Sequence, residues 1–253
     1  MKRLTAILLL FFFKTLPVTA QPFASWSGKE LILNNGVVER TISLPSVPGP
    51  FITTLYKPVQ GSHRFFEKES PDFQFEVSGT LYSGKGNWTV RNVKRHNDSR
   101  QGDGAAITLL SQDKKIELTI QFLLYPDLPV VRKNLEIKNL SSKTAMVESV
   151  DVEKFDVTGY SASTFSWICH DYGRRRSIGP YNGNMQDALV TVHNSDWEQG
   201  IVIGNEASGV LKHTAVFWEE LAISSGLTHK NAVYPFRKYL QPSEVFVTPQ
   251  VFT

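Results

Sequence analysis

The stretch QFLLYPDLPVVRKNLEIKN, residues 121–139, predicts two β-strands joined by a tight turn. Apolar residues at every second position before the turn are typical of a strand with one buried face: Ile116, Leu118, Ile120, Phe122 and Leu124. Pro126 and Pro129 then fix φ and remove two backbone donors, so they end the strand pairing. The alternation resumes at Val131, but Lys133 interrupts the apolar face. We therefore expect Lys133 to lie near a sheet edge or under a loop.

Short alternating runs of the same kind recur along the chain and are separated by turn residues. They cover residues 30–33, 37–44, 73–77, 88–90, 105–110, 147–152, 189–192, 200–203, 210–218 and 245–251. The Asn35-Gly36 pair between the first two runs is a strong hairpin signal. Apolar periodicity at helical spacing is almost absent. The sequence predicts an all-β fold with little helix, and a two-sheet antiparallel β-sandwich gives every strand a face to bury.

Residues 158–186 are the longest segment without clean alternation, and their glycines predict a long loop. A loop of this length in a compact domain is more often functional than accidental. Its arginines could bind a carboxylate or a polar ligand, and its aromatic side chains suit sugar or interface contacts. The candidate substrate- or interface-binding residues are Trp167, Asp171, Tyr172, Arg174, Arg175 and Tyr181. A solvated surface loop is the alternative interpretation.

Residues 1–20 predict a secretory signal peptide. Lys2 and Arg3 give it a positive start, residues 7–13 an apolar run, and residues 18–20 small side chains for cleavage. The apolar run is short for a membrane span, and no later stretch approaches that length. We expect export to the periplasm or the extracellular space, with residues 21–253 forming one β-sandwich domain. The single cysteine, Cys169, excludes an internal disulfide.

The net charge gives no reason to expect nucleic-acid or membrane binding. The whole sequence has 27 Lys+Arg and 24 Asp+Glu, a formal charge of +3. Removing Lys2, Arg3 and Lys14 with the signal peptide, which has no acidic residue, lowers the basic count from 27 to 24 and balances the acids. A neutral mature chain has no basic footprint for an anionic partner.

No group of residues has the spacing of a catalytic or metal site. The densest acids are Asp151, Glu153 and Asp156 and the pair Glu219-Glu220. We interpret them as solvent-facing residues at sheet edges rather than as the carboxylate pair of a glycosidase. The six histidines are scattered, without HExxH spacing, and one cysteine cannot build a thiolate site. We therefore expect no catalytic residue, no metal and no cofactor in this chain.

Four stretches give the sequence a familiar order of features. They are YPDLPVVRKNLEIKNLSS (125–142), GRRRSIGPYNGNMQDALVTV (173–192), EQGIVIGNEASGVLK (198–212) and LQPSEVFVTPQVF (240–252). In this order the chain resembles the N-terminal β-sandwich domain of glycoside hydrolase family 36, the α-galactosidases. The resemblance implies a supersandwich of the galactose-mutarotase-like type. It also implies that the catalytic aspartates belong to a (β/α)8 barrel after this domain, and no residue of this chain matches them.

The preferred interpretation is a non-catalytic N-terminal domain of an exported α-galactosidase-like glycoside hydrolase. Its partner would be the catalytic barrel, and the loop at 158–186 would reach a galactoside in the sugar site. We also expect a homo-oligomer, because the surface that would meet the barrel is exposed in the isolated domain. Two alternatives stay open at this point: a freestanding carbohydrate-binding module, with Trp167, Tyr172 and Tyr181 as its aromatic platform, and a structural or interaction domain without sugar affinity.

Overall fold

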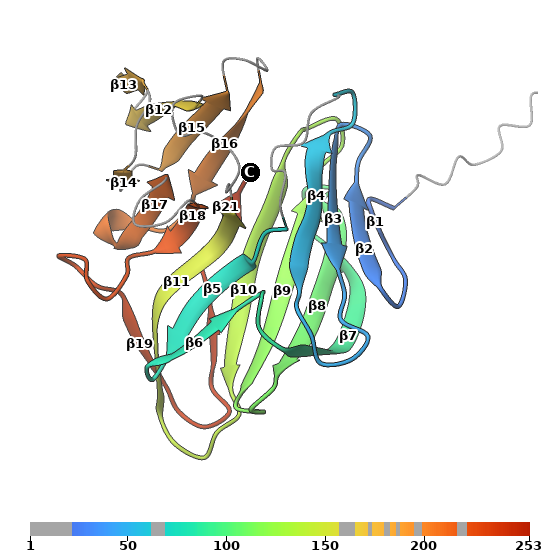
Figure 1. Ribbon diagram of the computed structural model, residues 1–253, viewed down its shortest axis with the longest axis vertical. Coiled ribbons are helices and arrows are strands. Elements are labelled where there is room, and N and C mark those ends of the chain that lie inside the picture. The colour runs from blue at the N-terminus through green and yellow to red at the C-terminus, as the bar shows by residue number, and fades with distance from the viewer. Residues whose placement is uncertain are drawn as a thin grey trace, which may run out of the picture.

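The computed structural model describes residues 22–61, 69–156, 165–171, 174–179, 183–185, 188–194, 199–216 and 222–253. The expected signal peptide at 1–20 lies outside these ranges. The described residues form β-strands and one short 3-10 helix, η2 (Gly209–Leu211) (Figure 1). In this part of the chain, no helix is both long enough and apolar enough to cross a membrane.

The described strands pair into three antiparallel sheets, in which strands that are neighbours in space need not be neighbours in the chain. The 4-stranded sheet contains β1 (Ala24–Trp26), β2 (Glu30–Asn34), β3 (Val38–Ser43) and β4 (Ile52–Pro58). The 10-stranded sheet contains, from one end to the other, β13 (Arg174–Gly179), β12 (Phe165–Asp171), β15 (Leu189–Asn194), β16 (Gln199–Asn205), β21 (Val251–Phe252), β10 (Val131–Asn139), β9 (Ile116–Leu124), β8 (Asp103–Ser111) and β7 (Trp88–Asn97), with β20 (Val245–Val247) also paired to β10. The 7-stranded sheet contains, in the same sense, β14 (Gly183–Met185), β17 (Lys212–Val216), β18 (Ala222–Leu227), β11 (Ala145–Asp156), β5 (Asp72–Val77) and β6 (Thr80–Ser83), with β19 (Arg237–Leu240) paired to β11.

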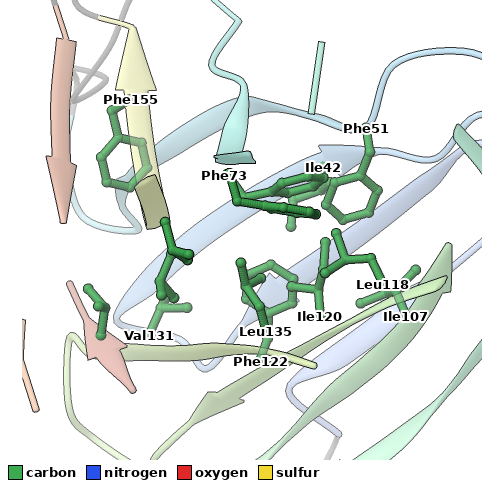
Figure 2. Close-up of a cluster of buried hydrophobic side chains, with 14 of the residues drawn as sticks. Ile42, Phe51, Phe73, Ile107, Leu118, Ile120, Phe122, Val131, Leu135 and Phe155 are labelled. Carbon is green, nitrogen blue, oxygen red and sulfur yellow. The ribbon is translucent and has the colours of Figure 1, made fainter. Parts of the chain in front are cut away.

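The main core lies between two layers of strands, which confirms the predicted β-sandwich. Figure 2 shows Ile42 of β3, Phe73 of β5 and Phe155 of β11 on one side, facing side chains of β8, β9 and β10 on the other. The facing residues labelled there are Ile107, Leu118, Ile120, Phe122, Val131 and Leu135. All of these side chains are buried. Apolar burial from both layers is the main stabilising term of such a fold.

Both predicted hairpins form. Strands β9 and β10 pair from Val131 opposite Leu124 to Asn139 opposite Ile116, on either side of the two-proline turn. The Asn-Gly signal corresponds to the β2–β3 hairpin, where Gly36 adopts φ +85°, a conformation that glycine tolerates. Asn35 connects the two turns, because its amide nitrogen donates to the carbonyls of residues 125 and 128, at 2.7 Å each.

The prediction of a long loop at 158–186 is wrong over much of that segment. Residues 165–171 form β12, residues 174–179 form β13 and residues 183–185 form β14. Strands β12 and β13 form a hairpin at the end of the 10-stranded sheet, and β14 pairs with β17 at the end of the 7-stranded sheet. The glycines of this segment do not prevent pairing: the strands are only three to seven residues long, and Gly179 and Gly183 lie at the end of β13 and the start of β14.

Candidate functional site

Strand β11 carries two buried charge clusters on opposite faces, and a β-bulge separates them. Asp151 is paired with Gly226 of β18, whereas Glu153 is paired with Ser225, so two steps along β11 match one step along β18. Successive residues of β18 point to opposite faces of the sheet. The bulge therefore sends the carboxylates of Asp151 and Glu153 to opposite faces, although their spacing in a regular strand would put them on one face.

The first group, the core charge cluster, consists of Arg40, Asp72, Lys133 and Glu153. The Arg40 guanidinium lies 2.7 Å from Asp72 Oδ1 and 3.0 Å from Glu153 Oε2. The Lys133 ammonium lies 2.9 Å from Glu153 Oε1 and also pairs with Asp72. All four side chains are almost completely buried. Two cations thus meet two anions, and this pairing offsets the large desolvation cost of burying each charge.

Aromatic rings surround the Arg40 guanidinium. Its Cζ lies 5.2–5.3 Å from the ring centres of Tyr56, Phe122 and Phe155, in the range of cation–π contacts. Burial alone would lower the pKa of Arg40, but the charges of Glu153 and Asp72 outweigh it and hold the pKa above its ordinary value. The guanidinium is therefore a fixed cation inside the sandwich.

Two expectations from the sequence are wrong in this region. Lys133 lies in the centre of the sandwich, neither at a sheet edge nor under a loop, because two distant carboxylates neutralise it. Asp151 and Glu153 are buried rather than solvent-facing, and only Asp156 of that group is partly exposed, beside Lys85 at 2.8 Å. A pattern of alternating apolar and polar residues identifies a strand with one buried face. It could not reveal the burial of β11, because both faces of this strand are covered.

The second group, the Asp–His–His cluster, consists of Asp151, His213 and His229. Asp151 Oδ1 lies 3.1 Å from Nε2 of His213, on β17, and 2.8 Å from Nε2 of His229, which follows β18. The two imidazole ring centres are 4.3 Å apart. The histidines that looked scattered in the sequence therefore converge on one carboxylate, because the β17–β18 hairpin brings these two together.

A glycine makes room for this convergence. Gly226 of β18 is paired with Asp151 on one side and with His213 on the other, so both side chains flank a residue that has none. A Cβ at Gly226 would lie 2.1 Å from the Val150 carbonyl oxygen, which is too close for any side chain. The absent side chain lets β11 approach β18 at the bulge and lets the carboxylate and the imidazole meet.

Burial differs across the Asp–His–His cluster. The Asp151 side chain is 0% exposed, that of His213 is 3% exposed and that of His229 is 31% exposed. Burial alone would raise the pKa of Asp151, but the hydrogen bonds from His213 and His229 outweigh it and hold the pKa well below its usual range. Asp151 is therefore an anion at neutral pH, with solvent access on the side of His229.

One oxygen of this carboxylate lacks a hydrogen bond. Asp151 Oδ2 is buried and accepts none. The Lys154 ammonium lies 4.0 Å away from it and donates to Gln74 Oε1 at 3.1 Å. A buried carboxylate oxygen without a donor is costly, and such groups in native proteins often mark a missing ion or water.

Four of the six binding residues predicted from the sequence lie at a different place, on the β12–β13 hairpin. Asp171 of β12 is paired directly with Arg174 of β13, and Arg175 is paired with His170. Trp167 lies further along β12, opposite Gly179. Tyr172 and Tyr181 lie outside the described residues. The structure thus brings the backbones of Asp171, Arg174 and Arg175 together, and a role for them in binding stays a prediction.

Sequence reasoning missed the Asp–His–His cluster. Its two histidines are 62 and 78 residues from Asp151 in the chain, and no local motif joins them. The one available signal was the pattern of a hairpin made of β17 and β18. His213 lies near the start of β17, and His229 comes just after the end of β18. Recognising that antiparallel pair would have placed the two imidazoles at the same end of it.

Comparison with known proteins identifies the architecture. No protein-family model and no curated protein matches the sequence. Solved structures do match: α-galactosidase AgaB of family 36 from Geobacillus stearothermophilus superposes with a TM-score of 0.64 at 14% identity, over 90% of this chain and 40% of the enzyme. The fold is that of the family 36 α-galactosidases. The resemblance inferred from the sequence is confirmed at this level.

Two further structures agree. The α-galactosidase from Lactobacillus brevis matches with a TM-score of 0.65 at 12% identity, over 88% of this chain and 39% of that one. The galactosidase domain of AgaSK, an α-galactosidase–sucrose kinase, matches with a TM-score of 0.67 at 10% identity, over 90% of this chain and 41% of that one. This chain therefore spans about two fifths of the length of the family 36 structures that it matches.

Proposed function

We propose that this chain is the non-catalytic N-terminal β-sandwich domain of an exported α-galactosidase-like glycoside hydrolase. The observation that carries the proposal is the extent of the match, which takes in most of this chain but only 39–41% of each α-galactosidase. The remainder of those enzymes is the part that the resemblance assigns to the catalytic (β/α)8 barrel. Retaining hydrolysis through a glycosyl intermediate would then belong to that barrel and not to the sandwich.

The acids of the chain support a non-catalytic role. A retaining glycosidase needs two carboxyl groups about 5 Å apart at a site that a sugar can enter. The buried acids Asp72 and Glu153 share the cations of the core charge cluster and are sealed from solvent. Asp151 is held by two histidines. Each of these three carboxylates therefore has a partner that occupies it.

The β12–β13 hairpin is the element that we propose to reach the sugar site of the barrel. It ends the 10-stranded sheet, and its tip places an acid, Asp171, opposite a guanidinium-bearing residue, Arg174. Acid and arginine side chains can hydrogen-bond sugar hydroxyls, and an aromatic residue such as Trp167 suits stacking on a sugar ring. A galactoside is the ligand that the resemblance implies.

The C-terminal part of the sandwich offers apolar surface for the barrel or for a second subunit. Several large apolar side chains are exposed there: Val233, Tyr234, Tyr239, Val245 and Val247. Val233 is 87% exposed. Exposed apolar side chains concentrated in one segment are typical of interaction surfaces. We propose that this segment packs on the catalytic barrel.

Two measurements test the proposal. The coding DNA beyond Thr253 should encode a barrel with aspartates at its strand ends. The purified chain without that barrel should not hydrolyse aryl α-galactosides and should not bind melibiose in a calorimetric titration. Hydrolysis that disappears on changing one acid of this chain would contradict the proposal. Melibiose binding without hydrolysis would favour the carbohydrate-binding module instead.

The role of the hairpin has its own test in the full-length enzyme. Arg174→Ala should raise KM for melibiose, because a polar contact with the sugar would be lost. Lys143→Ala, at an exposed position between β10 and β11, is the matched control and should leave the kinetics unchanged. Equal kinetics in both variants and in the unmodified enzyme would remove the hairpin from the sugar site.

A further inference from the structure

We propose that Asp151, His213 and His229 bind a zinc ion. This inference is independent of the proposed glycosidase association, because it rests on the side chains of the sandwich alone. Two imidazole nitrogens and a carboxylate oxygen are a donor set that zinc uses in proteins. The candidate ligand atoms of the three residues all lie within 4.8 Å of one another.

The distances between the donor atoms fit a tetrahedral ion. Bonds of about 2.0–2.2 Å to zinc put neighbouring ligand atoms roughly 3.3 Å apart. Asp151 Oδ1 is 3.1 Å from Nε2 of His213 and 2.8 Å from Nε2 of His229. These two distances must therefore lengthen by a few tenths of an ångström, which side chains can do without a change of rotamer.

The buried oxygen of Asp151 is an independent sign of a missing ligand. Oδ2 accepts no hydrogen bond although it is fully buried. A bound cation would satisfy it by electrostatic attraction or by bidentate coordination, and it would offset a desolvation cost that the histidines leave uncompensated. Asp72 Oδ2 also lacks a hydrogen bond, but the other oxygen of that carboxylate, Oδ1, pairs with both Arg40 and Lys133, so this acid is already neutralised.

The scaffold holds the three ligands in place before a metal arrives. Asp151 and His213 stand on strands that flank Gly226, and His229 follows the strand that carries this glycine. His229 is the ligand with solvent access, at 31% exposure. An ion can therefore enter at His229, and a water can complete the coordination shell from that side, as in sites with three protein ligands.

One nearby charge opposes the ion. The Lys154 ammonium lies 4.0 Å from Asp151 Oδ2. The site thus has one carboxylate among its ligands and one ammonium beside it, so its affinity should be lower than that of sites with several thiolates. Zinc binding through Nε2 requires that each imidazole carries its proton on Nδ1, so the hydrogen bonds from Nε2 to Asp151 are replaced by bonds to the ion.

A titration tests the proposal. The purified chain, without a histidine tag and stripped with a chelator, is titrated with Zn²⁺ by calorimetry and with Co²⁺ by visible absorption. The expected result is one ion per chain, with a tetrahedral Co²⁺ spectrum. His229→Gln should weaken Zn²⁺ binding by at least about tenfold, by analogy with the smallest effects of disturbing a metal site. His229 lies partly exposed outside the strands, so this variant should fold.

Two controls keep the test decisive. His96→Gln removes a histidine of β7, away from the cluster, and should leave stoichiometry and affinity unchanged. Asp151→Asn keeps the size of the side chain and should abolish the Co²⁺ spectrum. Absence of stoichiometric Zn²⁺ binding to the unmodified chain would overturn the proposal. Equal affinity in the His229→Gln and His96→Gln variants would overturn it as well, because the ion would then bind elsewhere.

Discussion

On the core face of β11, Glu153 meets two cations and shares them with a second acid, whereas on the opposite face Asp151 meets two imidazoles. The core charge cluster is balanced and sealed. Each cluster contains one carboxylate oxygen without a hydrogen bond, Asp72 Oδ2 or Asp151 Oδ2, but the Asp–His–His cluster also has a partly exposed member, His229. One extra residue in the strand separates the two arrangements.

The two faces of β11 use buried charge in different ways. A cluster whose charges balance and which is closed to solvent can hold strands together, but its carboxylates are already paired with cations and are not accessible to a ligand. A cluster with one carboxylate, two imidazole nitrogens and a route to solvent can instead supply ligand atoms to a cation. Changes on the core face should therefore alter stability, and changes on the Asp–His–His face should alter zinc binding more than stability.

The largest effect is expected from Glu153→Gln. This change leaves Arg40 and Lys133 with a single acid inside the sandwich, and an uncompensated buried charge should cost about 3–5 kcal/mol of unfolding free energy. Urea unfolding measures it. Glu117→Gln is the matched control, because its 33%-exposed side chain pairs with the 37%-exposed Lys138, and the loss of such a pair should cost under about 1 kcal/mol. Equal losses in both variants would erase the distinction between sealed and exposed pairs.

The second-largest effect is expected from Gly226→Ala, a change opposite the bulge that separates the two faces of β11. The added Cβ would meet the Val150 carbonyl at 2.1 Å, so the strands must separate, at about 1–3 kcal/mol of unfolding free energy. Zinc affinity should fall at the same time, because Asp151 and His213 flank this position. Gly28→Ala, with nothing within 4 Å of its Cβ, is the control and should change neither quantity. An unaffected zinc affinity in Gly226→Ala would show that the glycine does not position the cluster.

Tyr56→Phe probes the sealed side at high pH. The Tyr56 hydroxyl shares a hydrogen bond with Thr253 Oγ1 at 2.8 Å, so the change should cost about 1 kcal/mol near neutral pH. Burial raises the pKa of Tyr56 to about 12 from an ordinary 10.0. Because the pKa is higher in the folded state than in the unfolded state, the neutral Tyr56 hydroxyl stabilises the fold fully below pH 10. This contribution is lost as the pH rises from 10 to 12. The gap between the two proteins in urea unfolding should therefore narrow over that window, and a constant gap would contradict the burial of Tyr56.

The smallest effect is expected from Lys154→Met. Removing a cation 4.0 Å from Asp151 Oδ2 should raise zinc affinity about fivefold, the size of one charge interaction at that distance in water. Lys138→Met, which removes a half-exposed lysine of β10 that lies 3.6 Å from Glu117, is the control and should have no effect. Weaker zinc binding in Lys154→Met would mean that the lysine supports the cluster rather than opposing the ion.

Local pattern sufficed for part of the fold. The alternation around the two-proline turn and the Asn35-Gly36 pair predicted the β9–β10 and β2–β3 hairpins, because both depend on neighbouring residues. The buried position of Lys133 could not be predicted in this way. Its partners, Asp72 and Glu153, come from other strands, and a charged residue looks like an edge residue until its counter-charges are known.

The candidate site was beyond sequence reasoning for a related reason. Reading Asp151 and Glu153 as one face assumes a regular strand, and the bulge in β11 breaks that assumption without a signal of its own. His213 and His229 carry no metal-binding spacing, and only the hairpin between them makes them neighbours. The β12–β13 hairpin was hidden likewise, since its strands are short and rich in polar residues.

Anomalous diffraction at the zinc edge, on crystals of the chain grown with Zn²⁺, shows directly which face of β11 binds the ion. One strong peak is expected about 2.0–2.2 Å from Asp151 Oδ1 and from Nε2 of His213 and His229. No peak is expected among Arg40, Asp72, Lys133 and Glu153, where two cations already neutralise the acids. A peak in the core charge cluster, or none beside Asp151, would contradict the claim that the two faces of β11 serve different purposes.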